Sequence, residues 1–255
     1  MIDFKTMSID LREYREFASE LKFLVSPPTA ERIREWARAR LVPDPNASGE
    51  SSDAYRITSL YFDTRHFDVF HRRGSFGRSK YRIRRYGASE VAFLERKLKT
   101  RGLVSKRRTI VELEELGRLG DGEPDPDWAG HWYHQRLLAR RLKLVCQISY
   151  DRTARVAMTG YGPIRLTMDD DIRALAARGL AFNGETQGEL LCPNWIIIEL
   201  KYRLEMPAVF KQLVEEFALN PQPVSKYRLA AVALGYVKEF MAHNFVKDRL
   251  DAANA

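Results

Sequence analysis

Positive charges recur at every second residue between Lys80 and Arg84. Successive side chains of a β-strand point to opposite faces, so Lys80, Arg82 and Arg84 share one face. Tyr81 and Ile83 take the other face. An antiparallel sheet with one solvated face shows the same alternation. The alternation therefore predicts a strand with one cationic face. Whether that face turns outward to solvent or inward depends on the pattern of the neighbouring strands.

Five further strand-like segments repeat the alternation, and most of them add a carboxylate two residues from a cation. They contribute Glu20 with Lys22, Glu95 with Lys97, Tyr150 with Arg152, Arg165 with Thr167 and Asp169, and Glu199 with Lys201. If helices cover the apolar faces, these charged faces must turn inward and the sheet can close into a barrel with a polar lumen. Buried like charges repel, so such a lumen needs an anion.

The whole chain is strand-rich, with helical patterns at its flanks. Strands are expected over residues 20–25, 55–63, 79–87, 90–99, 107–113, 143–156, 163–175 and 194–202, and helices over 28–41, 64–73, 127–142, 207–219 and 224–245. We predict an α+β fold built on a closed antiparallel β-barrel tunnel of about eight strands with flanking helices. At this length the chain is expected to be one domain spanning residues 1–255.

The charge balance favours an anionic partner. Lys and Arg number 42 against 34 Asp and Glu, a net charge of +8. The two cysteines, Cys146 and Cys192, have no metal-type spacing. No apolar run reaches the roughly 20 residues of a membrane span, and the charged N-terminus is unlike a signal peptide, so we expect a cytoplasmic protein.

Alternating arginines suit phosphate oxygens, because each guanidinium offers a fork of N–H donors. The interleaved carboxylates Glu20, Glu95, Asp169 and Glu199 offer hard oxygen ligands for Mg²⁺ or Mn²⁺. Cations with a divalent metal are the groups that phosphoryl transfer requires. Nucleic-acid binding is not expected, because carboxylates on the same faces would repel a nucleic-acid backbone.

The ordered motifs resemble the VTC domain, the catalytic domain of vacuolar transporter chaperone polyphosphate polymerases. They are Glu20-x-Lys22, Tyr81-Arg82-x-Arg84, Glu95-Arg96-Lys97, Ser105-Lys106, Tyr150-x-Arg152, Arg165-Leu166-Thr167-Met168-Asp169, Glu199-x-Lys201 and Ser225-Lys226. The resemblance runs from about residue 17 to residue 237. It implies a member of the triphosphate tunnel metalloenzymes, related to the CYTH proteins, that transfers the γ-phosphate of ATP to a growing polyphosphate chain and depends on Mn²⁺ or Mg²⁺.

The resemblance also assigns candidate site residues. It implies catalytic roles for Arg82, Arg84, Arg152, Arg165 and Lys97, substrate binding by Lys22, Lys106, Tyr150, Lys201, Ser225 and Lys226, and metal binding by Glu199, with Glu20 and Glu95 as weaker candidates. Two of these residues have an ordinary alternative reading. Lys106 lies in the charge run SKRRT, and Ser225 opens a predicted helix, where a serine N-cap is common.

Two departures from the family's multidomain polymerases stand out: the sequence contains neither their phosphate-sensing SPX region nor their membrane spans, and Thr167 replaces a common serine while keeping the hydroxyl. The expected partners are ATP and polyphosphate, and no protein partner can be read from the sequence. Three alternatives stay open. They are hydrolysis of tripolyphosphate or a nucleoside triphosphate in the same tunnel, non-catalytic polyphosphate or phosphoprotein binding, and nucleic-acid binding.

Overall fold

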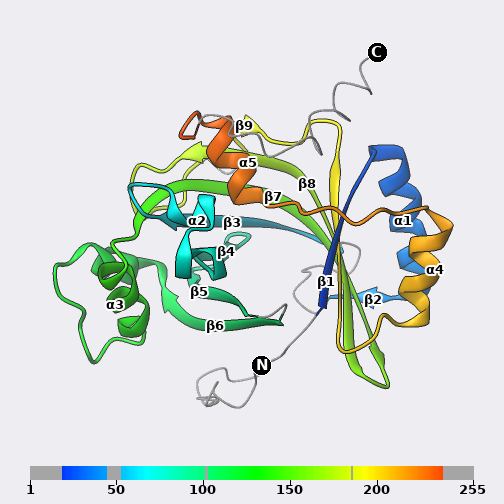
Figure 1. Cartoon of the computed structure of the whole chain (residues 1–255), viewed down its shortest axis with the longest axis horizontal. Coiled ribbons are helices and arrows are strands. Elements are labelled where there is room, and N and C mark those ends of the chain that lie inside the picture. The colour runs from blue at the N-terminus through cyan, green and yellow to red at the C-terminus, as the bar shows by residue number, and fades with distance from the viewer. Residues whose placement is uncertain (1–18, 45–52, 101–102, 185, 238–255) are drawn as a thin grey trace.

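The computed structural model describes residues 19–44, 53–100, 103–184 and 186–237 (Figure 1). Within these ranges the chain is an α+β fold with one antiparallel sheet and five α-helices. The strands are β1 (Ser19–Val25), β2 (Val42–Pro43), β3 (Ala54–Asp63), β4 (Ser79–Tyr86), β5 (Val91–Thr100), β6 (Leu103–Glu112), β7 (Lys143–Thr159), β8 (Gly162–Ala176), β9 (Glu189–Leu190) and β10 (Ile196–Tyr202). The helices are α1 (Pro27–Arg40), α2 (Asp68–His71), α3 (His131–Ala139), α4 (Ala208–Glu216) and α5 (Lys226–Ala233), with 3₁₀ turns η2 (Gly74–Arg78) and η3 (Leu113–Gly120).

All eight expected strands are present, and they form one curved path in the order β1-β10-β8-β7-β3-β4-β5-β6. The short strands β2 and β9 pair with β7 and β8 and were not expected. Closure of the sheet into a barrel is not confirmed. In the described part of the chain, β1 and β6 end the path and share no hydrogen-bonded ladder. A barrel needs that last pairing, because a sheet without it keeps two free edges.

Helices α1 and α4 cover the outer face of β1, β10 and β8 (Figure 1). Phe23, Leu166 and Ile198 turn toward them and pack with Ile33 of α1 and Leu213 of α4, all at most 2 % exposed. These are the apolar residues of the alternating segments. The opposite, charged faces of the same strands therefore turn toward the inside of the sheet, as the alternation predicts.

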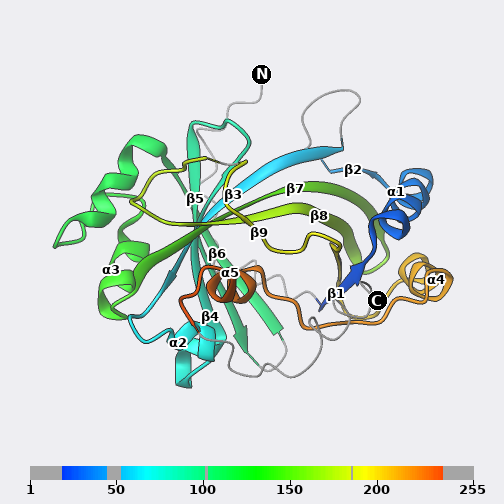
Figure 2. The same ribbon diagram turned by 90° about the horizontal axis from the view of Figure 1, so that it is seen from above.

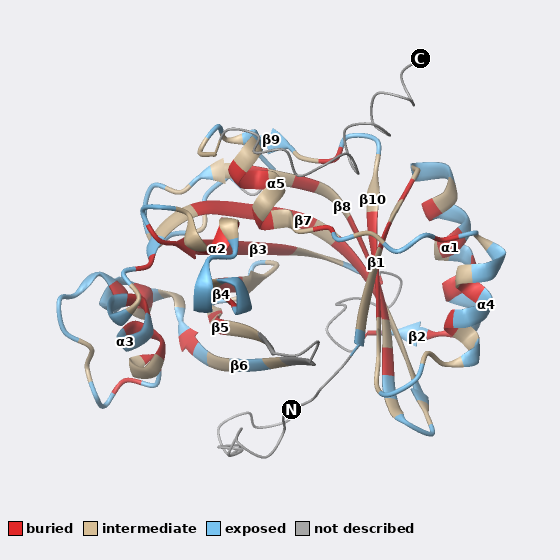
Figure 3. Ribbon diagram, in the orientation of Figure 1, coloured by how far each residue is buried: buried red, intermediate tan, exposed pale blue. Residues whose placement is uncertain are grey.

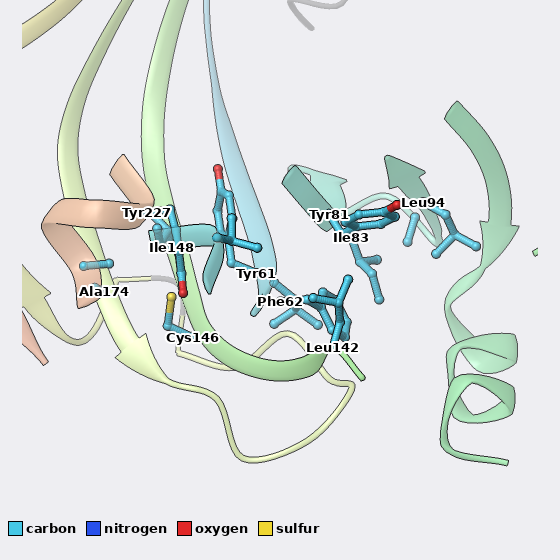
Figure 4. Packing of buried hydrophobic residues seen from close by; sticks show 14 of the residues in the cluster. Tyr61, Phe62, Tyr81, Ile83, Leu94, Leu142, Cys146, Ile148, Ala174 and Tyr227 are labelled. Atoms are coloured by element: carbon cyan, nitrogen blue, oxygen red, sulfur yellow. The ribbon is translucent and has the colours of Figure 1, made fainter. Parts of the chain in front are cut away.

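The outer face of β3 to β6 is covered by η3 and α3. Tyr81, Ile83 and Leu94 lie together in this second core (Figure 4), and Tyr133 of α3 packs against the same cluster. Burial follows the strands of both halves and falls off at the loops (Figure 3). Figure 2 shows α5 from above, beside β9, and the helix packs on β7 and β8.

Helix α2 is much shorter than the expected 64–73. The buried carboxylate of Asp63 accepts hydrogen bonds from the backbone N–H groups of Thr64, Val69 and Phe70 at 2.7–2.9 Å. Residues 64–67 therefore form a turn around this carboxylate, and the helix begins only at Asp68. The Tyr227 hydroxyl of α5 donates to the same carboxylate at 2.6 Å. The helices α3, α4 and α5 are also shorter than expected, and residues 238–245 of the last prediction lie outside the described residues.

Candidate functional site

A cavity of about 590 Å³ lies on the inner face of the sheet, closed on one side by residues 221–227. Most of the predicted site residues line it: Glu20, Lys22, Arg82, Arg84, Lys97, Tyr150, Arg152, Glu199, Lys201, Ser225 and Lys226. Most of them come from strands that are far apart in sequence. Because alternate side chains of each strand point to the inner face of the sheet, these residues meet in one cavity. Arg165, Lys106 and Glu95 are absent from this lining.

One wall of the cavity alternates lysine and glutamate. Lys22 lies 3.2 Å from Glu20 and 3.3 Å from Glu199, while Lys97 reaches Glu20 at 2.7 Å and Lys201 reaches Glu199 at 2.5 Å. Burial and the neighbouring Glu199 would raise the pKa of the Glu20 carboxyl, but the lysines outweigh them and lower it to about 2. Burial also opposes ionisation of Glu199, yet Lys201 and Lys22 hold the pKa of that carboxyl well below its usual range. Both glutamates are therefore ionised and held by lysines.

A second buried carboxylate, Asp169, joins two cavity cations. Arg152 donates to it through two hydrogen bonds of 2.6 and 2.7 Å, and Lys226 of α5 also donates to it. Asp169 is fully buried. Burial opposes its charge, but Arg152 and Lys226 lower the pKa of the carboxyl below its ordinary 3.8. Asp169 is thus an ionised counter-charge behind the lining, and it orients the two cations.

Glu95 has a similar role on β5, where it lies between Arg82 of β4 and Arg108 of β6. It is 1 % exposed and accepts hydrogen bonds from Arg82 at 2.7 Å and Arg108 at 2.8 Å, with Lys106 at 2.5 Å. Arg82 reaches the cavity, whereas Lys106 and Glu95 do not line it. The structure therefore separates Glu95 from Glu20 and Glu199, and it gives Glu95 the geometry of an orienting counter-charge.

Arg84 has no carboxylate partner among the described residues. Its guanidinium donates to the Tyr150 hydroxyl at 3.1 Å and to Ser59 Oγ at 3.2 Å, and it is 4 % exposed. The direct partners of this buried cation are neutral oxygens, and only the more distant Glu95 balances part of its charge. This arrangement suits an anion that enters the cavity.

Arg165 points away from the cavity toward Asp44, at 2.9 Å, and donates to the Tyr55 hydroxyl at 2.7 Å. It does not meet the other predicted cations. Thr167, on the same face of β8, is fully buried with no hydrogen-bond partner for its hydroxyl in the described structure. The contacts of Arg165 with Asp44 and Tyr55 therefore give this side chain a structural role.

Several lining residues were missed by the sequence reasoning. Tyr61 and Tyr227 line the cavity, as do Arg72, Arg78 and Lys80. The alternation placed Lys80 on the same face as Arg82, which was enough to predict that it lines the cavity, but none of the family motifs included Lys80. Arg72 follows the short helix α2 and Arg78 ends the 3₁₀ turn η2, and both elements are too short for periodicity to indicate the direction of a side chain. Ser225 makes no capping hydrogen bond to its helix, and its hydroxyl instead accepts a hydrogen bond from Lys80 Nζ at 2.9 Å.

The carboxylates that face the cavity fit a divalent metal with few protein ligands. Mg²⁺ is commonly held by one or two carboxylates together with substrate phosphates and water. Glu199 and Glu20 share Lys22 and offer such a pair. The described residues contain no group of three or more His, Cys, Asp or Glu side chains arranged to hold a metal. A metal here would therefore need oxygen ligands from the substrate.

Fold and cavity define an α+β protein with one curved antiparallel sheet whose inner face presents a cavity lined by basic residues. The chain belongs to the VTC domain family, which it matches over residues 17–234. That match covers every element of the sheet.

Solved structures resemble the chain at low sequence identity. A candidate adenylate cyclase from Bacillus halodurans is 18% identical, with 82% of this chain and 94% of that chain covered and a TM-score of 0.51. A candidate adenylyl cyclase from Hippeastrum, described as having a dominant triphosphatase activity, is 14% identical, with 89% and 100% covered and a TM-score of 0.49. No curated protein sequence matches the chain. Among the described residues, no helix has the length and apolar character needed to cross a membrane.

Proposed function

We propose that this chain is a metal-dependent polyphosphate polymerase that transfers the γ-phosphate of ATP to a growing polyphosphate chain in the cavity. The observation that carries the proposal is the convergence of buried cations from separate strands on one cavity, next to the carboxylate pair Glu20 and Glu199. Membership of the VTC domain family supports it.

The cations act through charge and position. Arg84 and Arg152 would bind the non-bridging oxygens of the reacting phosphates and neutralise charge that develops during transfer. The Tyr150 hydroxyl accepts a hydrogen bond from Arg84 and can donate a hydrogen bond to a phosphate oxygen. No protein nucleophile is required, because the terminal phosphate of the polymer is the acceptor.

Glu199 and Glu20 would hold Mn²⁺ or Mg²⁺, which would supply charge neutralisation at the substrate phosphates. In the structure both carboxylates are engaged by Lys22, Lys97 and Lys201. Substrate phosphates can take over these lysines and release carboxylate oxygens. Binding of polyanion and binding of metal should therefore be mutually favourable.

We also propose that the sheet closes around the polyphosphate and that residues 1–255 form one domain. A contact between the two halves of the sheet supports closure: Lys97 of β5 donates to Glu20 of β1 at 2.7 Å, although β5 and β1 lie near opposite ends of the strand path. A polyanion between these strands would add further bridges across the same gap.

The test follows ADP, orthophosphate and polymer length together, with purified protein, ATP, Mn²⁺ or Mg²⁺, and a short polyphosphate primer. We expect ADP to form together with lengthening polymer. Glu199→Ala and Arg84→Ala should lose the activity. Arg85→Ala is the matched control, because Arg85 lies on the same strand on the other face and donates to the Ser89 backbone carbonyl.

Other outcomes would contradict the proposal. ADP with an equal amount of orthophosphate and no longer polymer would select triphosphate hydrolysis. Tight, salt-sensitive polyphosphate binding that needs no metal and survives Glu199→Ala, without ATP turnover, would select a binding module. Affinity for DNA or RNA well above that for polyphosphate would select nucleic-acid binding.

A further inference from the structure

The segment from α2 to β4 brings three cations to the mouth of the cavity. Arg72 follows α2, Arg78 ends η2, and Lys80 lies on β4 two residues before Arg82. Arg72 and Arg78 are exposed and Lys80 is half-buried, and all three line the cavity. We call them the outer cationic cluster. All three are more exposed than Arg84, which lies four residues after Lys80 on β4 and is 4 % exposed.

The backbone holds this cluster in a fixed place. The Asp63 carboxylate binds the first N–H groups of α2 and the Tyr227 hydroxyl, which ties the segment to α5. Arg72 has a left-handed backbone with φ 56°, which is costly for a residue with a Cβ atom. Gly77 packs so closely that a Cβ there would lie 2.6 Å from the Arg72 carbonyl oxygen. Strain at Arg72 and close packing at Gly77 indicate that the position of these arginines is specified.

The outer cationic cluster has no carboxylate partners. Within the described residues none of its three members forms an ion pair, and the only side-chain hydrogen bond of Lys80 goes to Ser225. This contrasts with Lys22, Lys97, Lys201 and Lys226, which all reach carboxylates. Burial and then Lys22, Lys97, Arg72 and Arg82 lower the pKa of Lys80 to about 7. Three cations placed together without counter-charge form a site for an external anion.

The inner cations already offer enough groups for a short phosphate chain. Four less exposed cations line the same cavity: Arg82 and Arg84 of β4, Arg152 of β7 and Lys226 of α5. The outer cationic cluster extends the same line of positive charge outward through Lys80. A longer linear chain can reach both parts, whereas a triphosphate held at the inner cations is too short to occupy both equally.

We propose that Arg72, Arg78 and Lys80 form an outer subsite that binds the phosphates of a linear polyphosphate beyond those held by Arg82, Arg84 and Arg152, so that the protein prefers long chains to triphosphates. The proposal rests on the proposed function only for the class of ligand. Binding at equilibrium tests it, and no turnover is needed.

The experiment measures dissociation constants of tripolyphosphate and of a linear polyphosphate of about 15 phosphates by isothermal titration calorimetry. The wild-type chain is compared with the double variant Arg78→Gln/Lys80→Gln. Losing charge-assisted hydrogen bonds should weaken binding of the long chain at least about tenfold and that of tripolyphosphate less than about threefold. Arg73→Gln is the matched control, because Arg73 is adjacent to Arg72 but pairs with Asp68 and does not line the cavity.

Equal weakening of both ligands would overturn the proposal, since the residues would then belong to the triphosphate site. Unchanged binding of the long chain would overturn it too. The variants should fold, because they remove uncompensated charge, and circular dichroism melting checks this. If no polymer forms with ATP but the preference for long chains falls in the double variant, the polymerase proposal fails and the outer subsite stands.

Discussion

Replacing Asp169 with asparagine should destabilise the fold and at the same time strengthen its response to polyphosphate. Asp169 is fully buried and compensates Arg152, through hydrogen bonds of 2.6 and 2.7 Å, and Lys226. Asparagine keeps the shape but loses the charge, which leaves two buried cations uncompensated. Breaking a buried ion pair from one side costs about 3–5 kcal/mol. At about 2–4 °C per kcal/mol for a chain near this size, the melting temperature should fall by about 6–20 °C.

Thermal unfolding by circular dichroism, with and without tripolyphosphate, measures both effects. Because Arg152 and Lys226 line the cavity, the anion can replace the missing charge. The rise in melting temperature caused by tripolyphosphate should therefore be larger in Asp169→Asn than in the wild type. Asp170→Asn is the control, since Asp170 lies on the other face of β8 and only approaches Arg34, at 3.4 Å.

The pH dependence gives a further check on the same residue. The folded-state pKa of Asp169 lies below its ordinary 3.8, so its stabilisation is complete above about that value and is lost as the pH falls toward the folded pKa. The difference between wild type and Asp169→Asn should therefore persist at neutral pH and shrink only in strongly acidic solution. A melting temperature within 2 °C of the Asp170→Asn control, or an equal tripolyphosphate shift in both proteins, would refute the reasoning.

Three further changes test other parts of the structure. Leu213→Ala truncates a fully buried side chain and should lower the free energy of unfolding by about 2–5 kcal/mol in a denaturant titration. Val42→Ala, at a side chain that is 61% exposed, should change the free energy of unfolding very little. Burial and the nearby Lys22, Lys97, Arg72 and Arg82 lower the pKa of Lys80 to about 7, so near pH 8 binding of polyphosphate should make Lys80 take up a proton. Calorimetry in buffers of different ionisation enthalpy measures this uptake, which should be smaller in Lys80→Gln. Equal uptake in both proteins would contradict the prediction. Gly77→Ala should displace the turn at Arg72 and weaken long-chain binding with little loss of tripolyphosphate binding, whereas unchanged binding would mean that the turn does not position the subsite.

The sheet was largely predictable because period-2 alternation reports which side of a strand is apolar. Phe23, Leu166 and Ile198 lie under helices and the charged residues between them turn inward, as expected. Closure was not readable, because it depends on whether the first and last strands of the path meet, and alternation contains no pairing information. The helix predicted over 64–73 is present as α2 but is shorter than expected, since the role of Asp63 depends on its burial and on Tyr227, far away in sequence.

Among the candidate site residues, strand residues were found more easily than those of loops. Alternation and motifs led to Arg82, Arg84 and Arg152, which line the cavity. They could not show that Arg165 would turn to Asp44, because that contact depends on the packing of a segment outside any motif. Nor could they show that Ser225 would bind Lys80 instead of capping its helix.

The lysine and glutamate wall has a consequence for how binding responds to salt. Counter-ions around DNA diffuse away when a protein replaces them, and their gain in translational entropy makes affinity fall steeply with salt concentration. Glu20, Glu199 and Asp169 are counter-ions that are covalently attached, so their displacement by phosphate yields no such gain. The salt dependence of polyphosphate binding should therefore follow Arg84 and the outer cationic cluster, which form no ion pair among the described residues, rather than the full number of basic residues in the cavity.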